Sequence, residues 1–544
     1  MINTSDNKSS KTSHSPQSRD LHLSKKGIIS QALHVGGLTF LSRLLGIFRE
    51  MLQTNYLGVG ILSDAFITAF KIPNFLRKIF AEGALSASFV PHIVGMVKDG
   101  RKDDASSLMS AAFVVFEGMV LLLCAIVMIW PEFVIWLFSP GFDATQMAAT
   151  VPMIRVLFPF IFFISSCALL TGALQSVNHF LVTALGPVLL NIVYIGGLLL
   201  CIKYNLPPLY LCFAVLLGGA VKLITRFLVY RYKNFTFGPL TRQSFSDLSI
   251  VLKRFSACLL GVGILEIHMI VDLRFASYLP VGSTTLIYYA NRFLQMPLSI
   301  FAVALSTVLL PHFSRLATGS KNRLSFYLLE VSKLITWISL PVTFYLMFVS
   351  RPIFANLMLY GKGTPEQITI AAQLLLLFAI GFVFFALNRS LINIFYALKN
   401  TWTPTWITAI AALINILGNW LGIKFFGITG IVLATVIGGI TTTVLFVWML
   451  SAKHQLTIYF GPYFMFLRRY APQAFCGMTL YIVGHHMTFH LLTKTTHSSF
   501  FMDSFGYWAV SIPLLLLMFK FLLVTRRFFG INLYFLSNTS ISKV

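Results

Sequence analysis

The chain has 544 residues and a mass of 60.9 kDa, and 57% of its residues are hydrophobic while only 11% are charged. A soluble domain carries about 25% charged residues, so this composition excludes an ordinary water-soluble protein. The formal net charge of +24 does not by itself indicate nucleic-acid binding, because Lys and Arg concentrate on the cytoplasmic loops of membrane proteins. The sequence therefore predicts an all-α polytopic membrane protein.

Residues 1–27 are polar and rich in Ser and Lys, and no small-residue cleavage site follows them. We expect a disordered cytoplasmic tail here, not a signal peptide. Apolar runs of the length that a bilayer-spanning helix needs then recur along the chain, and we count fourteen. Their centres fall near residues 38, 75, 120, 163, 190, 217, 262, 298, 337, 380, 412, 438, 478 and 515.

A short repeat relates the second apolar run to the eighth. The tripeptide Ala-Leu-Ser at 84–86, followed by Pro-His at 91–92, recurs with the same spacing at 304–306 and 311–312. A duplication would produce two six-helix lobes of like orientation, an architecture found in transporters. We expect an N-lobe over 28–235, a C-lobe over 245–452, helices 13 and 14 over 465–530 and a cytoplasmic tail over 531–544.

Charged residues fall inside the first two predicted helices. Arg43 and Glu50 share one stripe with Arg49 beside it, and Asp64 and Lys71 share a stripe on the next helix. An ionisable group in hydrocarbon costs at least about 2.5 kcal/mol, so these residues must snorkel, pair or line a wet cavity. Because cations outnumber acids, we expect an anion-binding cavity, with a structural charge network as the alternative.

The eighth predicted helix adds Arg292, beside a polar stripe of Asn291, Gln295 and Ser299. Pro297 should break the backbone hydrogen bonds of this helix. Arg suits a phosphate ligand because its planar guanidinium binds two oxygens and stays charged when desolvated. We therefore expect Arg292 to face the cavity from the second lobe.

Polar side chains also occur in the seventh and eleventh predicted helices. Asp272 and Arg274 could pair with each other, and Asn415 and Asn419 lie one turn apart. An acid with amide oxygens could coordinate Na⁺ or relay a proton, although membrane helices also use Asn for interhelical hydrogen bonds.

No zinc-protease, nucleophile-elbow, Walker A or Rossmann motif occurs in the sequence. We expect a transporter without a cofactor, not an enzyme. Without a phosphate-binding loop, any active transport must use a Na⁺ or proton gradient or the membrane potential.

Three stretches resemble the signature of the MurJ/MviN lipid II flippases, which belong to the multidrug/oligosaccharidyl-lipid/polysaccharide exporter superfamily. They are SRLLGIFRE at 42–50, SDAF at 63–66 and KIPNFLRKIFAEGA at 71–84, and the segment 288–311 resembles the family too. The similarity extends from about residue 28 to 530. It implies fourteen helices, with two lobes around a cationic cavity and a groove for the lipid tail near helices 13 and 14.

The resemblance also implies roles for individual residues. The substrate-binding positions of the family fall on Arg43, Arg49, Arg77, Arg292 and Asp64. A family gate residue falls on Glu82, and many relatives carry acids where this chain has Asn291 and Gln295. We expect Glu50 and Lys71 to balance charge in the same cavity.

A sodium site in some relatives matches Asp272, Asn415, Asn419 and Thr435. An acid expected near position 419 is Asn in this chain, so Na⁺ binding should be weaker here.

The expected function is translocation of lipid II, the undecaprenyl-diphosphate-linked peptidoglycan precursor, from the inner to the outer leaflet by alternating access. The protein would lie in the bacterial cytoplasmic membrane among membrane lipids, in contact with the cell-wall synthesis machinery, and would not bind nucleic acid. One alternative is another exporter of the superfamily, for polysaccharide-linked lipids or drugs. The other is a membrane enzyme acting on polyprenyl phosphates, for which Asp99, Asp103 and Asp104 are the nearest candidate metal ligands.

The distribution of basic residues predicts that both termini and the loop near residue 240 are cytoplasmic. Most loop Lys and Arg residues fall on that side, and the opposite side carries Lys203, Arg351, Lys362, Lys424 and Lys494. In a cysteine-free background, an impermeant thiol reagent outside the cell should modify a cysteine placed near position 143 but not one near 240. The reverse labelling pattern would contradict this orientation.

Overall fold

The computed structural model describes residues 25–78, 85–177, 179, 181–317, 319–358, 363–496 and 505–536. Helices and their connections, without a strand, make up these residues. In chain order the helices are α1 (Lys25–Leu57), α2 (Ile61–Arg77), α3 (Ser86–Lys98), α4 (Lys102–Ala112), η2 (Phe113–Glu117), α5 (Gly118–Ile129), α6 (Pro131–Phe138), α7 (Ala144–Leu157), α8 (Phe160–Ser176), α9 (Leu181–Tyr204), α10 (Pro208–Tyr232), α11 (Arg242–Ala276), α12 (Ser283–Leu298), η3 (Ser299–Val303), α13 (Ala304–Ala317), α14 (Lys321–Met358), α15 (Pro365–Ala397), α16 (Trp402–Phe426), α17 (Ile428–Ala452), α18 (Phe460–Thr496), α20 (Phe505–Thr525) and η4 (Tyr534–Leu536).

Every one of the fourteen predicted centres lies inside a helix. Among the described residues, nine helical spans are long and apolar enough on their own to cross a membrane. The helices below that threshold include α1, α2, α11 and α12, which carry the charged residues singled out in the sequence. The predicted fold class, an all-α polytopic membrane protein, is confirmed.

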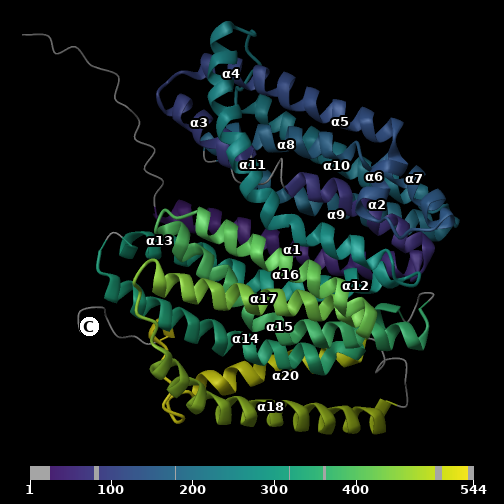
Figure 1. Cartoon of the computed structure of the whole chain (residues 1–544). Coiled ribbons are helices and arrows are strands. Elements are labelled where there is room, and N and C mark those ends of the chain that lie inside the picture. The colour runs from purple at the N-terminus through teal and green to yellow at the C-terminus, as the bar shows by residue number, and fades with distance from the viewer. Residues whose placement is uncertain are drawn as a thin grey trace, which may run out of the picture.

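The helices pack as two groups with α1 and α11 between them (Figure 1). In the first group α9 packs against α10, α2 against α7, and α3 against α8. In the second, α14 packs against α15, α16 against α17, and α12 against α15, while α18 and α20 pair with each other and contact α14. Helix α1 contacts both α9 and α14, so it borders both groups. The exact boundaries of the predicted lobes stay a prediction.

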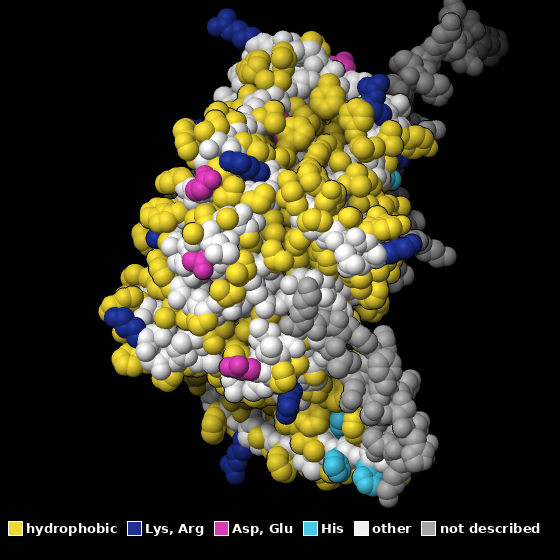
Figure 2. Space-filling view, turned by 90° about the vertical axis from the view of Figure 1, so that its right-hand side faces the viewer, with side chains coloured by type: hydrophobic (Ala, Val, Ile, Leu, Met, Phe, Trp, Pro, Cys, Tyr) yellow, Lys and Arg dark blue, Asp and Glu magenta, His cyan; other side chains and the backbone are white. Residues whose placement is uncertain are grey.

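The outer surface is apolar, as a surface facing lipid must be. On the face shown in Figure 2, hydrophobic side chains dominate and charged side chains stand singly. Large apolar side chains elsewhere on the helices are also exposed, among them Leu122, Leu217, Phe425 and Phe475. Buried side chains instead form separate apolar clusters within each group of helices.

One feature recurs in both groups, a helix hairpin that is closely packed at a glycine. The hairpin α9–α10 is closely packed at Gly197, where an added Cβ would lie 2.2 Å from the Cβ of Ala214. In the hairpin α16–α17, a Cβ on Gly430 would likewise lie 2.2 Å from the backbone of Gly422. Both helix pairs therefore depend on residues without a side chain at the contact. The duplication itself stays a prediction.

Pro297 has the predicted effect on the backbone. Helix α12 ends one residue after it, and the π-helical segment η3 joins α12 to α13. Pro73, in contrast, lies inside α2, which continues to Arg77.

The last described segment is packed against the helices. Residues 531–536 were expected to begin a cytoplasmic tail, but Ile531 and Leu533 are buried in a cluster with α14, α18 and α20. The N–H of Tyr534 donates to the Glu330 carboxylate at 3.2 Å. A free tail would therefore start later than the sequence suggests, and residues 1–24 of the predicted N-terminal tail lie outside the described part of the chain.

Gly196 and Gly197 provide a matched test of the hairpin packing. Gly197→Ala should lower the thermal unfolding midpoint in detergent, because overpacking typically costs about 1–3 kcal/mol. Gly196→Ala should leave the midpoint unchanged or raise it, since nothing lies within 4 Å of its added Cβ and Ala favours a helix. Equal midpoints for the two variants would show that the α9–α10 contact does not limit stability.

Candidate functional site

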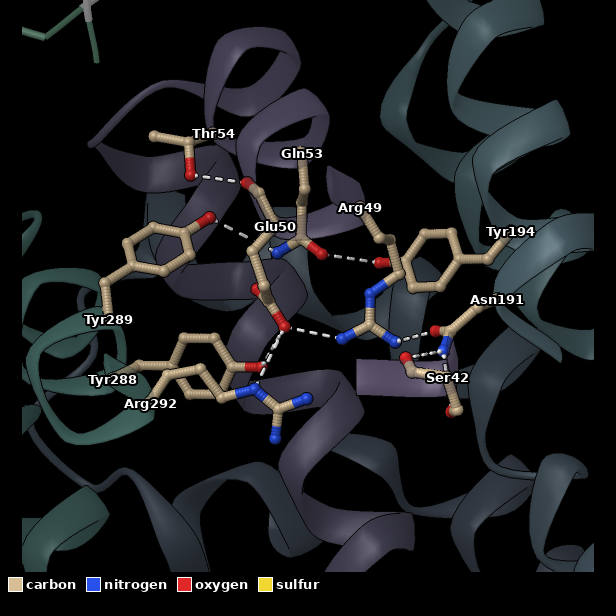
Figure 3. A network of polar contacts seen from close by, with 10 residues as sticks. All are labelled: Ser42, Arg49, Glu50, Gln53, Thr54, Asn191, Tyr194, Tyr288, Tyr289 and Arg292. Atoms are coloured by element: carbon tan, nitrogen blue, oxygen red, sulfur yellow. Dashed lines mark hydrogen bonds and ion pairs between the residues drawn. The ribbon is translucent and has the colours of Figure 1, made fainter. Parts of the chain in front are cut away.

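A buried ion pair lies on α1 at the border with α9. Nη2 of Arg49 donates to Oε1 of Glu50 at 2.5 Å, and Nη1 donates to Oδ1 of Asn191 at 3.0 Å (Figure 3). The guanidinium also lies over the ring of Tyr194, 4.9 Å from its centroid. Arg49 is 6% exposed and Glu50 is fully buried. Two partly satisfied charges are thus held in the interior, where removing either partner is strongly destabilising.

The same carboxylate also reaches the second group of helices. Nε of Arg292, on α12, lies 3.3 Å from Oε1 of Glu50, and the hydroxyl of Tyr288 donates to that oxygen at 3.4 Å. The Arg292 side chain is 42% exposed, in contrast to Arg49. One acidic oxygen therefore serves two arginines from opposite sides, while Oε2 of Glu50 makes no hydrogen bond to a described residue.

A second layer of hydrogen bonds orients these side chains. The hydroxyl of Tyr194 donates to Oε1 of Gln53 at 2.7 Å, and Nε2 of Gln53 donates to the hydroxyl of Tyr289 at 3.4 Å. Nδ2 of Asn191 donates to the backbone oxygen of Ser42 at 2.9 Å. Figure 3 shows that these residues enclose the Arg49–Glu50 pair from α1, α9 and α12.

Sequence reasoning missed this second layer. Asn191 and Tyr194 are polar residues three apart in an otherwise apolar run, and that spacing was the available signal. Their contact with Arg49 depends on how α9 is rotated toward α1, which the sequence does not show.

Arg43 also connects the two groups of helices, at a different position along α1. It is half-buried, and its Nη2 donates at 3.1 Å to the backbone oxygen of Ser299, the first residue of η3. Asn291 is half-buried and Gln295 is exposed on α12. Arg43 and Arg292 therefore both make contacts between α1 and the second group of helices, and a shared substrate role with Arg49 stays a prediction.

Asp64 is placed differently from the sequence expectation of substrate contact. Its carboxylate accepts from the N–H of Gly282 at 2.6 Å, from the N–H of Thr285 at 2.9 Å and from the Thr285 hydroxyl at 2.5 Å. Gly282 has a φ of 94°, which glycine adopts without strain. Asp64 thus satisfies the free N–H groups at the start of α12, an interaction that the positive end of a helix favours.

Further contacts cross between chain segments at the same end of the molecule. The N–H of Gly141 donates to the Ser277 hydroxyl at 3.0 Å, and Nε2 of Gln367 donates to the backbone oxygen of Val59 at 3.3 Å. Nη1 of Arg274 donates to the backbone oxygen of Leu137 at 2.7 Å. The two groups of helices therefore meet at this end of the molecule, and the contacts close it.

The predicted pairing of Asp272 with Arg274 is wrong. Besides its bond to Leu137, Arg274 lies over the ring of Trp136, 5.8 Å from its centroid. Asp272 instead faces α16 and α17. Residues two apart on a helix lie about 200° from each other around its axis, so Asp272 and Arg274 point to different neighbours.

The structure brings together the four predicted cation-site residues. Nδ2 of Asn419 lies 3.3 Å from Oδ1 of Asp272, and the Thr435 hydroxyl lies 3.4 Å from Oδ2. Nδ2 of Asn415 donates to the Thr435 hydroxyl at 3.3 Å. Oδ1 of Asn419 is buried without a hydrogen-bond partner among the described residues. A carboxylate, two amides and a hydroxyl can supply oxygens to Na⁺, so the residues fit the ion, with a single negative charge.

Two of the remaining predicted residues, Lys71 and Arg77, lie on α2. Nζ of Lys71 lies 5.4 Å from the centroid of the Tyr288 ring, within electrostatic range of both Asp272 and Asp64. Lys71 thus lies between the cation-site residues and the arginine cluster. Nε of Arg77 donates to Oδ1 of Asn74 at 3.1 Å, and Glu82 lies outside the described residues.

Comparisons with known proteins identify the family. The family model described as lipid II flippase MurJ matches residues 54–501. A probable lipid II flippase MurJ of Buchnera aphidicola subsp. Acyrthosiphon pisum is 31% identical over 418 residues, covering 75% of this chain and 80% of the relative. A lipid II flippase MurJ of Burkholderia cenocepacia is 29% identical over 421 residues, covering 76% and 82% respectively.

Solved structures agree in fold. A lipid II flippase MurJ in an inward closed conformation superposes with a TM-score of 0.73 at 26% identity, covering 91% of this chain and 99% of that chain. An inward-facing multidrug resistance MATE family transporter of the MOP superfamily shares the fold, with a TM-score of 0.64 at 15% identity over 77% of this chain and 97% of that chain. Since the family model covers more than half of the sequence, the chain belongs to the MurJ family of lipid II flippases.

Proposed function

We propose that this chain moves lipid II from the inner to the outer leaflet of the bacterial cytoplasmic membrane by alternating access. The observation that carries the proposal is the single Glu50 carboxylate shared by Arg49 of α1 and Arg292 of α12. A diphosphate offers oxygens of the same chemistry as this carboxylate, with more charge. It can therefore replace Glu50 as the partner of Arg292, while Glu50 stays paired with Arg49.

Binding would proceed by exchange of partners. Arg292 is the exposed member of the cluster, so it would meet the diphosphate first and release Glu50. Glu50 would keep its bond to Arg49 and to the hydroxyl of Tyr288. Arg43, held now only by a backbone oxygen, could turn to the ligand at little cost. The cavity would thus bind the diphosphate without leaving a buried charge unpaired at any step.

Asp64 would serve as a gate and not as a ligand for the substrate. In this conformation its carboxylate is 1% exposed and joins α2 to the start of α12. Opening the closed end would separate these helices and expose both the carboxylate and the backbone N–H groups to water. The closed end is the outer one in the proposed topology, so this conformation would admit lipid II from the cytoplasmic side.

The polyprenyl tail would remain in lipid while the head group crosses the cavity. Helices α18 and α20 pair beside α14 and expose large apolar side chains, including Phe475, Leu491, Leu516 and Leu517. A chain of isoprene units can lie against such a surface without desolvating any polar group.

The energy for the cycle would come from the membrane potential. A diphosphate carries roughly two negative charges, and each gains about 2.3 kcal/mol on moving outward across 100 mV, or about 4.6 kcal/mol in total. Lys71 lies close enough to Asp272 to neutralise it partly, so an ion need not occupy the site in every cycle. Na⁺, when bound there, would add a positive charge beside Lys71 and Asp272.

The family excludes the enzyme alternative considered from the sequence. Contact with the cell-wall synthesis machinery stays a prediction, as do the inner-membrane location and the cytoplasmic termini.

Removing either shared arginine should stop transport. Arg49→Ala and Arg292→Ala should fail to complement cells depleted of this protein, although both variants still insert in the membrane. Arg→Lys should restore part of the activity, because Lys provides charge without the two-pronged geometry. Arg155→Ala is a control, since Arg155 is exposed on α7. Full activity of Arg49→Ala and Arg292→Ala would exclude the cavity proposed here.

The energy source can be tested separately. Collapsing the membrane potential while the proton and Na⁺ gradients are kept should stop flipping of lipid II in cells, measured by its accessibility at the outer leaflet. Asp272→Asn should be tolerated, because Lys71 then lacks only one of its two acidic neighbours. Continued flipping without a potential, or an inactive Asp272→Asn variant, would instead favour coupling to an ion at α11.

A further inference from the structure

A second buried acid, Glu117, lies in the first group of helices and takes no part in the mechanism above. It occupies the last position of the π-helical segment η2, in the middle of the span Lys102–Ile129. Glu117 is buried, with 5% of its surface exposed. Single π turns inside helices occur frequently at functional sites, because they direct a side chain away from the regular helical register.

The carboxyl group of Glu117 has no charged partner. Neither of its oxygens makes a hydrogen bond, and no ion pair reaches it, from any residue that the structure describes. The hydroxyls of Ser165 and Ser166, on α8, lie beside it, and the Ser166 hydroxyl is itself buried without a partner. Both carboxyl oxygens and the Ser166 hydroxyl are thus buried with no hydrogen-bond partner in the part of the chain that the structure describes.

The other titratable groups around this position are few. Helix α5 contributes Cys124 and α8 contributes Cys167. On α10, Lys222 and Arg226 come within electrostatic range of Cys167. Arg226 is already engaged, since it donates to the backbone oxygens of Cys167 and Thr183. The charged residues of α4 lie at its far end, in its first turn.

Glu117 lies at the boundary between two apolar clusters. Phe116 belongs to the cluster formed by α3, α4 and α11, while Val120 belongs to the cluster formed by α2, α7 and α9. On α8 the same change occurs between Leu169 and Ile164, on either side of the two serines. The glutamate and the serines therefore form a thin polar layer between two apolar clusters, midway along the helix Lys102–Ile129.

A carboxylate cannot remain charged and unpaired in such a place, because burying an isolated ion costs far more than neutralising it. A protonated carboxyl group, in contrast, is neutral, and its O–H can donate to a serine hydroxyl, which accepts as well as donates. We propose that Glu117, with Ser165 and Ser166, is a proton-binding site, and that it holds its proton in this conformation. Loss of the proton would require water to enter between η2 and α8, and so would accompany a change in the packing of these helices.

The site can be tested without substrate on the purified full-length protein in lipid nanodiscs. An apolar carbodiimide forms a stable adduct with a carboxyl group that carries a proton in an apolar environment. Mass spectrometry at pH 7 should find the adduct on Glu117 and not on Asp103 or Asp104, which lie at the start of α4 near the water. The adduct should disappear in Glu117→Gln and decline as the pH is raised.

An infrared difference spectrum provides a measurement that does not depend on access of the reagent. The carbonyl stretch of a protonated carboxylic acid should be present at pH 7 in the unmodified protein and absent in Glu117→Gln. Absence of that band from the unmodified protein would overturn the proposal. Protection of Glu117 by Na⁺ but not by choline, at constant pH, would assign the site to a metal cation and equally overturn it.

Neither readout involves lipid II, so their outcome is independent of whether the arginine cavity transports it.

Discussion

A charge inside a bilayer must have a partner, and the architecture of this protein follows from where those partners are found. Arg49 lies deep within α1 and is held by Glu50, Asn191 and Tyr194. Because these partners come from both α1 and α9, the position of α1 against the first group of helices is set by this cluster. Arg292 then connects the second group to the same Glu50 oxygen.

Two of the contacts between the helix groups differ in how completely their polar atoms are satisfied. The Asp64 carboxylate accepts three hydrogen bonds at the start of α12, and the residue is nearly inaccessible to water. The Glu50 cluster leaves one carboxylate oxygen unpaired and one arginine half exposed. A ligand can therefore perturb the second contact far more easily than the first. Binding of a diphosphate at the cluster would weaken one inter-group contact before the gate at Asp64 has to open.

The buried acids outside this cluster are neutralised in two different ways. Lys71 lies within electrostatic range of both Asp64 and Asp272 and near the Tyr288 ring, so the α2–α12 contact, the cation-site residues and the arginine cluster share one electrostatic environment. Glu117 is separate, enclosed by two apolar cores and two serines. In the first case an acid is balanced by a neighbouring base, and in the second a proton would do the same.

The helices of this protein, and the polar residues that share one face of a helix, follow from features that are local in the sequence. Apolar runs of bilayer length predicted the helices, and every predicted centre lies inside one, because backbone hydrogen bonding in lipid leaves the helix as the main option. The helical period placed Arg43 and Glu50 on one stripe, and the spacing of Asn415 and Asn419 placed them on one face. The grouping of Asp272 with these amides came from the family resemblance, and the geometry agrees with it.

Only the tertiary structure decided which polar groups meet across helices. In it, the Asp64 carboxylate accepts from the backbone N–H of Gly282. Arg274 donates to the backbone oxygen of Leu137 and does not pair with Asp272. The tertiary structure also buried Glu117, which no sequence pattern singles out, where η2 meets α8. The partner of a buried polar atom depends on the rotation and depth of two helices relative to each other. Neither quantity is encoded in the period of a single helix, so these contacts could not be predicted from the sequence alone.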